Sequence, residues 1–195
     1  GRPDGVTRIG LVLNEQGAQR AIDCGMDQLG AVTLATDAFG IRNQKQTSAE
    51  SVEVAKRIIA MGKAAGRNAQ ATISVAFGCP FAGEVDPAHV AAMARELAAA
   101  GPCEIALADT IGVAVPGQVS QLVAAVRAEI GTIPIRVHFH DTRNTAIANV
   151  WAAVEAGAVT VDAAIGGLGG CPFAPGAAGN VATEDVLYLL DRSGV

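Results

Sequence analysis

The feature that most constrains the fold is one pattern that is repeated six times along the chain. Each repeat has a short apolar run rich in β-branched residues, followed by an alanine-rich stretch, and the repeats recur about every 30 residues, the size of a βα unit. Runs that are almost wholly apolar are typical of parallel strands covered on both faces. The predicted strands are Thr7–Leu13, Gln28–Ala35, Ala69–Phe77, Glu104–Asp109, Ile135–His140 and Thr160–Ala164.

Capping residues mark where the helices between these strands begin. Thr47–Glu50 reads TSAE, a capping box, and Asp86–Pro87 combines an N-cap with proline at the first helical position. Thr183–Asp185 places acidic side chains in the first turn of the last helix. The predicted helices are Ala18–Cys24, Ser48–Gly66, Pro87–Ala100, Gly117–Ile130, Thr145–Ala156 and Thr183–Arg192.

Six βα units in series predict an α/β protein with a parallel sheet, either an open doubly wound sheet or a TIM (β/α)8 barrel. Chemically capable side chains follow many different strands, which favours the barrel because all of its strand ends meet at one mouth. An open sheet would gather its site mainly at one switch point. A whole barrel needs about 250 residues and this chain has 195, so we expect a partial barrel. The side chains in question belong to Asn14, Asp37, Cys79, Asp109, Thr110, His138, His140 and Asp141.

Composition narrows the class of protein. Half of the residues are hydrophobic (50%), enough for a buried core, and the net charge of −5 provides no basic footprint for nucleic acid. No apolar run is long enough to span a bilayer, and the first ten residues lack the apolar stretch of a signal peptide. The four cysteines form no Cys-x-x-Cys pair, which fits reduced thiols. We therefore expect a cytoplasmic protein that binds neither nucleic acid nor membranes.

The segment Val137–Asp141 reads VHFHD and is the strongest metal-binding signal in the chain. Residues two apart on a strand face the same side, so His138 and His140 can both point into the barrel mouth. Two neutral imidazoles bind a divalent cation and leave positions for oxygen ligands, which suits Mg²⁺, Mn²⁺ or Zn²⁺. The alternative is a pair of packed core histidines. His89, the third histidine, is interpreted as a solvated residue on a helix surface.

The segment Gly166–Asn180 surrounds Cys171 with six glycines and two prolines. It is either a linker that happens to contain a cysteine or a mobile loop that carries a reactive thiol over a pocket. A linker would need a second domain behind it, and only one predicted helix follows, so we favour the loop. Cys24 and Cys103 are interpreted as small buried hydrophobic residues, and Cys79 as a packing and turn residue.

Four segments carry a resemblance to a known family. In chain order they read FGCPFAGEVDP from Phe77, ALADTIGVAVPG from Ala106, VHFHDT from Val137 and GGLGGCPFAPGAAGNVATED from Gly166. They resemble the 3-hydroxy-3-methylglutaryl-CoA (HMG-CoA) lyase family, which are metal-dependent carbon–carbon lyases on a (β/α)8 barrel. The resemblance runs from about Arg8 to the end of the chain. The Gly-Leu-Gly-Gly-Cys-Pro run is its specific part, since related aldolases and condensing enzymes share His-x-His without this cysteine loop.

The resemblance implies roles for particular residues. A divalent metal ion, Mg²⁺ or Mn²⁺ with Zn²⁺ as the alternative, would be bound by His138, His140 and Asn180. The implied catalytic residues are Cys171, as the loop thiol that takes part in proton transfer, and Asp109. The implied contacts to an acyl-CoA substrate are Thr110 and Asn43. The residues around Asn43, and the run DTRN at Asp141–Asn144, depart from the family pattern and leave the exact acyl-CoA open.

By register with that family, residues 1–195 correspond to strands three to eight of one catalytic barrel domain. The family's first strand carries adjacent arginine and aspartate, whereas Gly1–Gly5 (GRPDG) has them in the other order with no apolar strand before it. We therefore expect two N-terminal βα units to be missing from this sequence. The strands at the two edges should then be unpaired and apolar.

Three hypotheses of function follow. The first is an HMG-CoA lyase, or a lyase for a close analogue, that forms acetyl-CoA and acetoacetate by metal-assisted cleavage, with a homodimer implied by the resemblance. The second is another metal-dependent aldolase or condensing enzyme, and the third is a non-catalytic remnant that acts as an interaction module. The cysteine loop favours the first over the second, and only the missing Arg-Asp strand favours the third.

Overall fold

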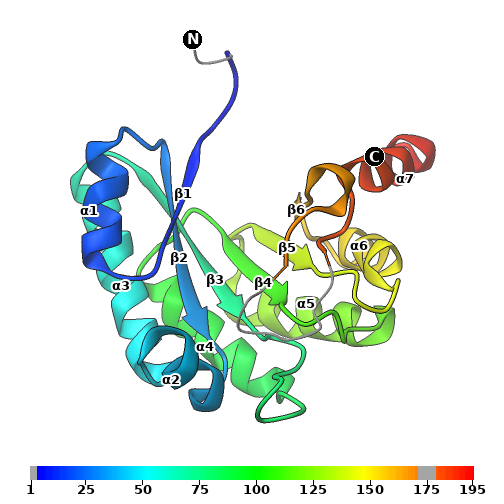
Figure 1. The fold of residues 1–195 in the computed structure, drawn as a ribbon, viewed down its shortest axis with the longest axis horizontal. Helices are drawn as coiled ribbons and strands as arrows, with labels where there is room; N and C mark the ends of the chain where they lie inside the picture. The colour runs from blue at the N-terminus through cyan, green and yellow to red at the C-terminus, as the bar shows by residue number, and fades with distance from the viewer. Residues whose placement is uncertain (1–3, 171–178) are drawn as a thin grey trace.

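Six parallel strands form one sheet that curves into part of a barrel (Figure 1). The computed structural model describes residues 4–170 and 179–195. The strands lie in the sheet in chain order, and each pairs in parallel with the next. This order confirms the predicted partial TIM barrel, because a doubly wound sheet reverses its strand order at a switch point. The strands are β1 (Ile9–Val12), β2 (Gln28–Leu34), β3 (Asn68–Ser74), β4 (Ile105–Asp109), β5 (Ile135–Phe139) and β6 (Thr160–Asp162).

Helices follow the strands and cover the outer face of the sheet (Figure 1). Each predicted helix is present, with bounds that differ by a few residues. The helix α2 was not predicted, because it is short, contains Gly40 and has no clear apolar stripe. In the described parts of the chain, no helix is both long and apolar enough to cross a membrane. The helices are α1 (Glu15–Asp23), α2 (Asp37–Gln44), α3 (Ser48–Ala64), α4 (Pro87–Ala99), α5 (Pro116–Ile130), α6 (Ala146–Glu155) and α7 (Thr183–Ser193), with a 3₁₀ turn η1 (Ile165–Gly167).

Local capping explains where the helices begin. At α3 the predicted capping box is confirmed: Thr47 Oγ1 accepts a hydrogen bond from Glu50 N at 3.2 Å, and Glu50 Oε2 accepts one from Thr47 N at 2.7 Å. At α1, Asn14 Oδ1 accepts a hydrogen bond from Gly17 N at 2.8 Å. Asn14 was grouped in the sequence with the side chains of the mouth, and the structure shows that it caps a helix.

The two faces of the sheet differ because alternate residues of a strand point to opposite sides. The outer face is mostly apolar and is buried against the helices, with Thr33 and Asp109 as buried polar exceptions. Around the cavity, the inner face is apolar on β1 and β2 and carries most of its polar side chains on the strands that follow. Gln28, at the start of β2, is a polar exception that donates a hydrogen bond to Gln70. The core between sheet and helices is therefore continuous, and the chemistry is confined to the inner face. The buried outer-face residues include Leu29, Ala31, Ala71, Ile73, Ile105, Leu107, Ile135, Val137 and Phe139.

Within the described chain, β1 and β6 are the two edges of the sheet. Apolar side chains are exposed at both: Leu11 on β1 has 73% of its surface exposed, and Val159, next to β6, has 68%. The prediction of unpaired apolar edges is confirmed.

The cysteines of the described chain occupy three different environments. Cys24 follows the last turn of α1 and is exposed, so the prediction that it is a buried residue was wrong. Cys103 is half-buried. Cys79 is buried, and its Sγ accepts hydrogen bonds from Thr36 Oγ1 at 3.1 Å and from Phe81 N at 3.4 Å. These contacts confirm the packing and turn role predicted for Cys79.

Candidate active site

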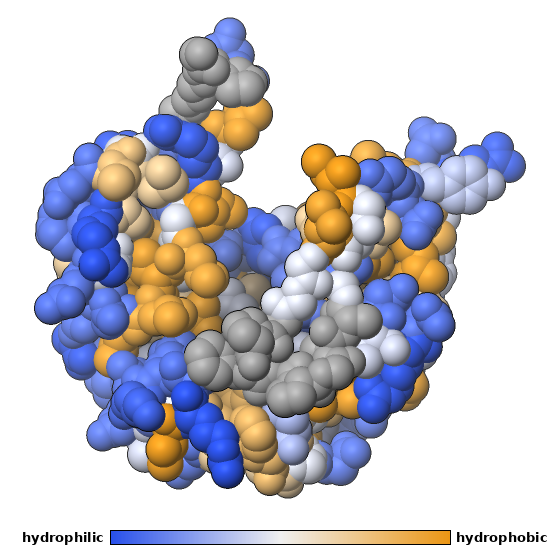
Figure 2. Space-filling view, viewed as in Figure 1, coloured by the Kyte–Doolittle hydropathy of each residue, from blue (hydrophilic) through white to orange (hydrophobic). Residues whose placement is uncertain are grey.

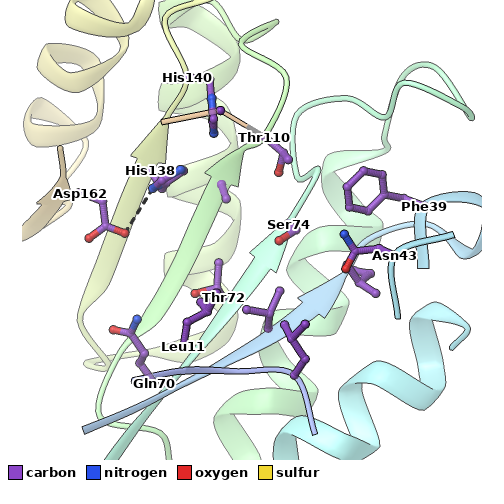
Figure 3. A pocket seen from close by; sticks show the side chains of 15 residues that line it. Leu11, Phe39, Asn43, Gln70, Thr72, Ser74, Thr110, His138, His140 and Asp162 are labelled. Carbon is purple, nitrogen blue, oxygen red and sulfur yellow. Dashed lines mark ion pairs between the residues drawn. The ribbon is translucent and has the colours of Figure 1, made fainter. Parts of the chain in front are cut away.

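A cavity of about 390 Å³ lies on the inner face of the sheet, where the strands end (Figure 3). One side of it, the apolar wall, comes from β1, β2 and α2, and Figure 2 shows hydrophobic residues gathered beside a hollow in this part of the molecule. The other side, the polar wall, comes from the four remaining strands and the residues that follow them. The apolar wall consists of Leu11, Leu13, Val32, Leu34 and Phe39, and the polar wall of Gln70, Thr72, Ser74, Thr110, His138, His140 and Asp162.

Both histidines of the VHFHD segment lie on the polar wall. The imidazole rings of His138 and His140 have centroids 5.3 Å apart, in an edge-to-face arrangement. Phe139, between them, points to the opposite face and is fully buried in the core. His138 Nδ1 lies 3.4 Å from a carboxylate oxygen of Asp162 (Figure 3). Strand alternation thus brings both rings to one cavity, as the sequence predicts.

Asn180 lies next to His140 through a backbone contact. It forms an isolated bridge with His140, at the point where the chain returns to the sheet. Its side-chain Nδ2 donates a hydrogen bond to Leu168 O at 2.8 Å. Its Oδ1 is buried and has no hydrogen-bond partner in the structure. A buried acceptor without a partner is costly, so this oxygen marks a place where a ligand is to be expected.

These residues fit a divalent metal ion. Two imidazole nitrogens and an amide oxygen are a donor set that Mn²⁺, Mg²⁺ and Zn²⁺ accept, with the remaining positions open to water or substrate oxygens. Over residues 4–170 and 179–195, no group of three or more His, Cys, Asp or Glu side chains is placed to hold a metal ion. Among the described residues, the buried amide oxygen of Asn180 is therefore a candidate third ligand beside the two histidines.

The two residues that end β4 point in different directions. Thr110 lines the cavity, and its Oγ1 accepts a hydrogen bond from Val75 N at 2.9 Å. Asp109 is fully buried on the other side of the strand, where its carboxylate accepts hydrogen bonds from Val113 N at 3.0 Å and Ala114 N at 2.9 Å. Burial raises the pKa of the Asp109 carboxyl, although these N–H groups act in the opposite direction. The geometry gives Asp109 a loop-positioning role, and its catalytic role stays a prediction.

Asn43 reaches the cavity from α2 and lines its apolar side. The loops around α2 are tied to the β3–α4 loop. The Phe39 and Phe81 rings are 6.1 Å apart, and the Arg42 guanidinium lies 4.2 Å above the Phe81 ring. His89, on α4, also holds this loop, since its Nε2 lies 2.9 Å from the backbone oxygen of Ala35, just before α2. His89 is exposed as predicted, but it is anchored to the neighbouring loop.

The glycine-rich segment is described only at its two ends, and Cys171 lies outside the described residues. The two ends approach each other closely: a Cβ atom on Gly179 would lie 1.9 Å from the Gly167 carbonyl oxygen. Gly169 has φ of +105°, and a Cβ atom there would lie 2.6 Å from Asn180 Nδ2. Glycine is therefore required where this segment begins and ends, next to Asn180.

Comparison with known proteins identifies the family. The family model described as HMGL-like matches residues 8–195. The chain belongs to this family. Two curated relatives of this HMGL-like chain are the 3-hydroxy-3-isohexenylglutaryl-CoA/hydroxy-methylglutaryl-CoA lyase of Pseudomonas aeruginosa, 40% identical over 187 residues, and the (R)-citramalyl-CoA lyase of Chloroflexus aurantiacus, 42% identical over 185 residues.

These alignments cover 96% and 95% of the HMGL-like chain, but 62% and 58% of the two relatives. The chain thus spans about three fifths of their length. Among solved structures, an HMG-CoA lyase from A. baumannii in complex with coenzyme A and 3-methylmalate matches with a TM-score of 0.93 and 36% identity. That match covers 100% of this chain and 64% of the other. It confirms the partial barrel.

Sequence reasoning missed two charged residues of the HMGL-like site, Asp162 and Arg136. Burial alone would raise the pKa of the Asp162 carboxyl, but hydrogen bonds from His138 and Arg136 outweigh it and the net shift is downward. Arg136 precedes His138 by two residues and so shares its face. The signal was present, since a charged residue at this position of an otherwise apolar strand must face inward and find a partner.

Proposed function

We propose that the whole protein is an acyl-CoA lyase that cleaves HMG-CoA, or a close analogue, to acetyl-CoA and acetoacetate. The observation that supports this best is the placement of His138 and His140 with the unpartnered Asn180 oxygen, in a chain of the HMGL-like family. Residues 1–195 are then part of one catalytic barrel domain. The relatives' names and the coenzyme A complex of a similar structure support an acyl-CoA substrate.

The cleavage removes a proton from a tertiary hydroxyl and leaves an enolate on the departing thioester. A divalent ion held by His138, His140 and Asn180 would supply a Lewis acid for the substrate oxygens. His138 and His140 line the polar wall of the cavity and would therefore fix where the hydroxyl lies. Thr110 Oγ1 accepts from Val75 N, which leaves its own O–H to donate to a substrate oxygen. Asn43 offers an amide from the opposite side.

Cys171 is proposed as the group that exchanges the proton. A cysteine thiol has an ordinary pKa of about 8.5, close enough to neutral for proton exchange when its surroundings lower it. Asn180 ends the segment that carries Cys171, so binding at the metal site and placement of the thiol are coupled through nine residues of backbone. Glycines at Gly167, Gly169 and Gly179 fix the two ends of the segment by close approach. Asp109 supports the adjacent β4–α5 loop.

Further properties of the whole protein are part of the proposal. Mg²⁺ or Mn²⁺ is favoured over Zn²⁺, because an amide oxygen and substrate oxygens complete the donor set. A homodimer and a cytoplasmic location are proposed from family membership and from the absence of Cys-x-x-Cys pairs. The net charge of −5 supports a small-molecule substrate in place of nucleic acid.

The test uses the protein expressed from its whole reading frame, with Mn²⁺ and a panel of HMG-CoA and citramalyl-CoA. Release of acetyl-CoA is followed for the wild type and for Cys171→Ser. Loss of a well-placed acid–base group costs about 10²–10⁴-fold in kcat, while Mn²⁺ affinity should stay unchanged because serine fills the same space. Cys24→Ser is the matched control, since Cys24 is exposed and distant in sequence. Normal turnover of Cys171→Ser would remove the thiol from the mechanism, and no turnover by the wild type with either substrate would remove the proposed reaction.

A further inference from the structure

A layer of charged side chains lies on the inner face of the sheet, next to the histidines on the side where the strands begin. Arg136 is at its centre, two residues before His138 on β5. Arg136 Nε donates a hydrogen bond to Glu104 Oε2 at 2.7 Å, and Arg136 Nη1 donates one to Asp162 Oδ1 at 2.5 Å. Thr160 Oγ1 donates to the other oxygen of Glu104 at 2.5 Å. The Arg136 and Glu104 side chains are only 13% and 10% exposed.

Asp162 links this charged layer to the histidine. Sheet register places His138 and Asp162 as paired residues of β5 and β6. One carboxylate oxygen of Asp162 is taken by Arg136, and the other lies 3.4 Å from His138 Nδ1 (Figure 3). The carboxylate is thus held from one side and directed at the imidazole on the other.

We propose that Asp162, held by Arg136, is a positioning residue that fixes the tautomer and orientation of His138. A neutral imidazole carries one proton, so an Nδ1–H directed at a carboxylate leaves the Nε2 lone pair for a metal ion. Carboxylates in this position make a ligating histidine more basic and orient its ring. The inference rests on the proposed metal site. It adds a residue, Asp162, that would contact the ligand His138 and not the metal ion itself.

Two other roles for Asp162 agree less well with the geometry. As a third carboxylate ligand it would join both histidines in a three-residue cluster, and no such cluster is found over the described residues. As a purely structural brace it would contribute little, because buried ion pairs barely repay the cost of removing their charges from water. Neither role explains why the second oxygen of Asp162 is directed at Nδ1.

The test measures Mn²⁺ affinity by electron paramagnetic resonance and the tautomer of His138 by long-range ¹⁵N–¹H NMR of the metal-free protein. The variants are Asp162→Asn and Arg136→Gln, with Arg95→Gln as the control, because Arg95 forms an exposed ion pair with Glu129. An amide at position 162 can donate to Nδ1 and so favours the wrong tautomer. We expect Asp162→Asn to weaken Mn²⁺ binding about 10–100-fold, Arg136→Gln to weaken it less, and Arg95→Gln to leave it unchanged.

The outcomes separate this inference from the proposed function. If the wild type binds Mn²⁺ and both Asp162→Asn and Arg136→Gln bind it equally well, the positioning role is overturned and the metal site stands. If the wild type binds no Mn²⁺, the metal site fails and the inference fails with it. The tautomer measurement needs no variant: wild-type His138 protonated on Nε2 overturns the inference even if a variant does not fold.

Discussion

The polar wall and the apolar wall of the cavity belong to one sheet but are held in place by different forces. On the polar wall, Asp162 pairs with His138 across neighbouring strands, and Arg136, which lies beside this wall, holds Asp162 by a further ion pair. On the apolar wall, Leu34 and Phe39 are almost fully buried and are held by packing against the core. Polar networks fix geometry with little net stability, whereas apolar burial supplies stability without directional control. Substitutions on the two walls should therefore fail in different ways.

The largest effect is expected from the polar wall. His140→Ala removes one of the proposed ligands, and the remaining imidazole and amide oxygen are too few to hold the ion. We expect stoichiometric Mn²⁺ binding to be lost and turnover to fall at least about 10³-fold, with a melting temperature near that of the wild type. Equilibrium dialysis against Mn²⁺ with a parallel thermal melt tests both statements. His89→Ala is the matched control, and metal binding retained by His140→Ala would contradict the ligand assignment.

The apolar wall should show the reverse behaviour. Leu34 is fully buried at the end of β2, and truncation to alanine leaves a cavity between the sheet and α2. We expect Leu34→Ala to lower the free energy of unfolding by about 2–5 kcal/mol, with Mn²⁺ affinity unchanged when measured well below the melting temperature. Chemical denaturation gives the first quantity. A loss of metal affinity as large as that of His140→Ala would show that the walls are not independent.

A side chain that both lines the cavity and supports the fold should give an intermediate effect. Thr110 lines the cavity, and its hydroxyl accepts from Val75 N, whose residue has φ of +52°. Thr110→Val keeps the shape but leaves that buried N–H without an acceptor, which costs about 1–3 kcal/mol. We also expect a raised KM for the acyl-CoA with Mn²⁺ affinity kept. Thr110→Ser should restore both values, and an unstable Thr110→Ser would mean that the methyl group matters more than the hydrogen bond.

The sequence predicted the strands and most helices because their signals are local. Apolar runs and capping residues act over a few neighbouring positions, and α3 begins at its capping box as expected. α2 escaped because an eight-residue helix with an interior glycine has too little periodicity to recognise. The histidines were found because alternation along one strand is enough to place both on one face.

The rest of the site depends on long-range geometry that no local pattern contains. Asp162 meets His138 only because of the register between β5 and β6, which is set by the packing of the whole sheet. Polar residues after strands proved ambiguous for a similar reason. Asn14 caps α1, and the Asp37 carboxylate accepts a hydrogen bond from Ser48 N at 2.7 Å. Loops need such acceptors as much as active sites do, so residue type and position alone could not distinguish the two uses.

The smallest effect concerns the acid sensitivity of the apolar side. α3 packs on β2 behind the apolar wall, and it begins at the Thr47–Glu50 capping box. The backbone N–H and the hydroxyl of Thr47, both bonded to the Glu50 carboxylate, lower its pKa below the ordinary value of 4.5. A lowered pKa in the folded state means stability that is present above the ordinary value and is lost as the pH falls through the folded-state value.

We therefore expect Glu50→Gln to be slightly less stable than the wild type near neutral pH and to approach it as the pH falls below the ordinary glutamate value. The glutamine amide can still cap the helix but does not titrate, so it removes one source of acid destabilisation. Melting temperatures recorded from about pH 7 to about pH 3 test this, because the scan has to pass below the lowered pKa of Glu50. The change in melting temperature should be smaller than that caused by Thr110→Val. Glu53→Gln is the matched control, because Glu53 lies one turn later and pairs with Lys56 at the surface. A gap between wild type and Glu50→Gln that stays constant with pH would show that the capping carboxylate does not contribute to the acid sensitivity of this side.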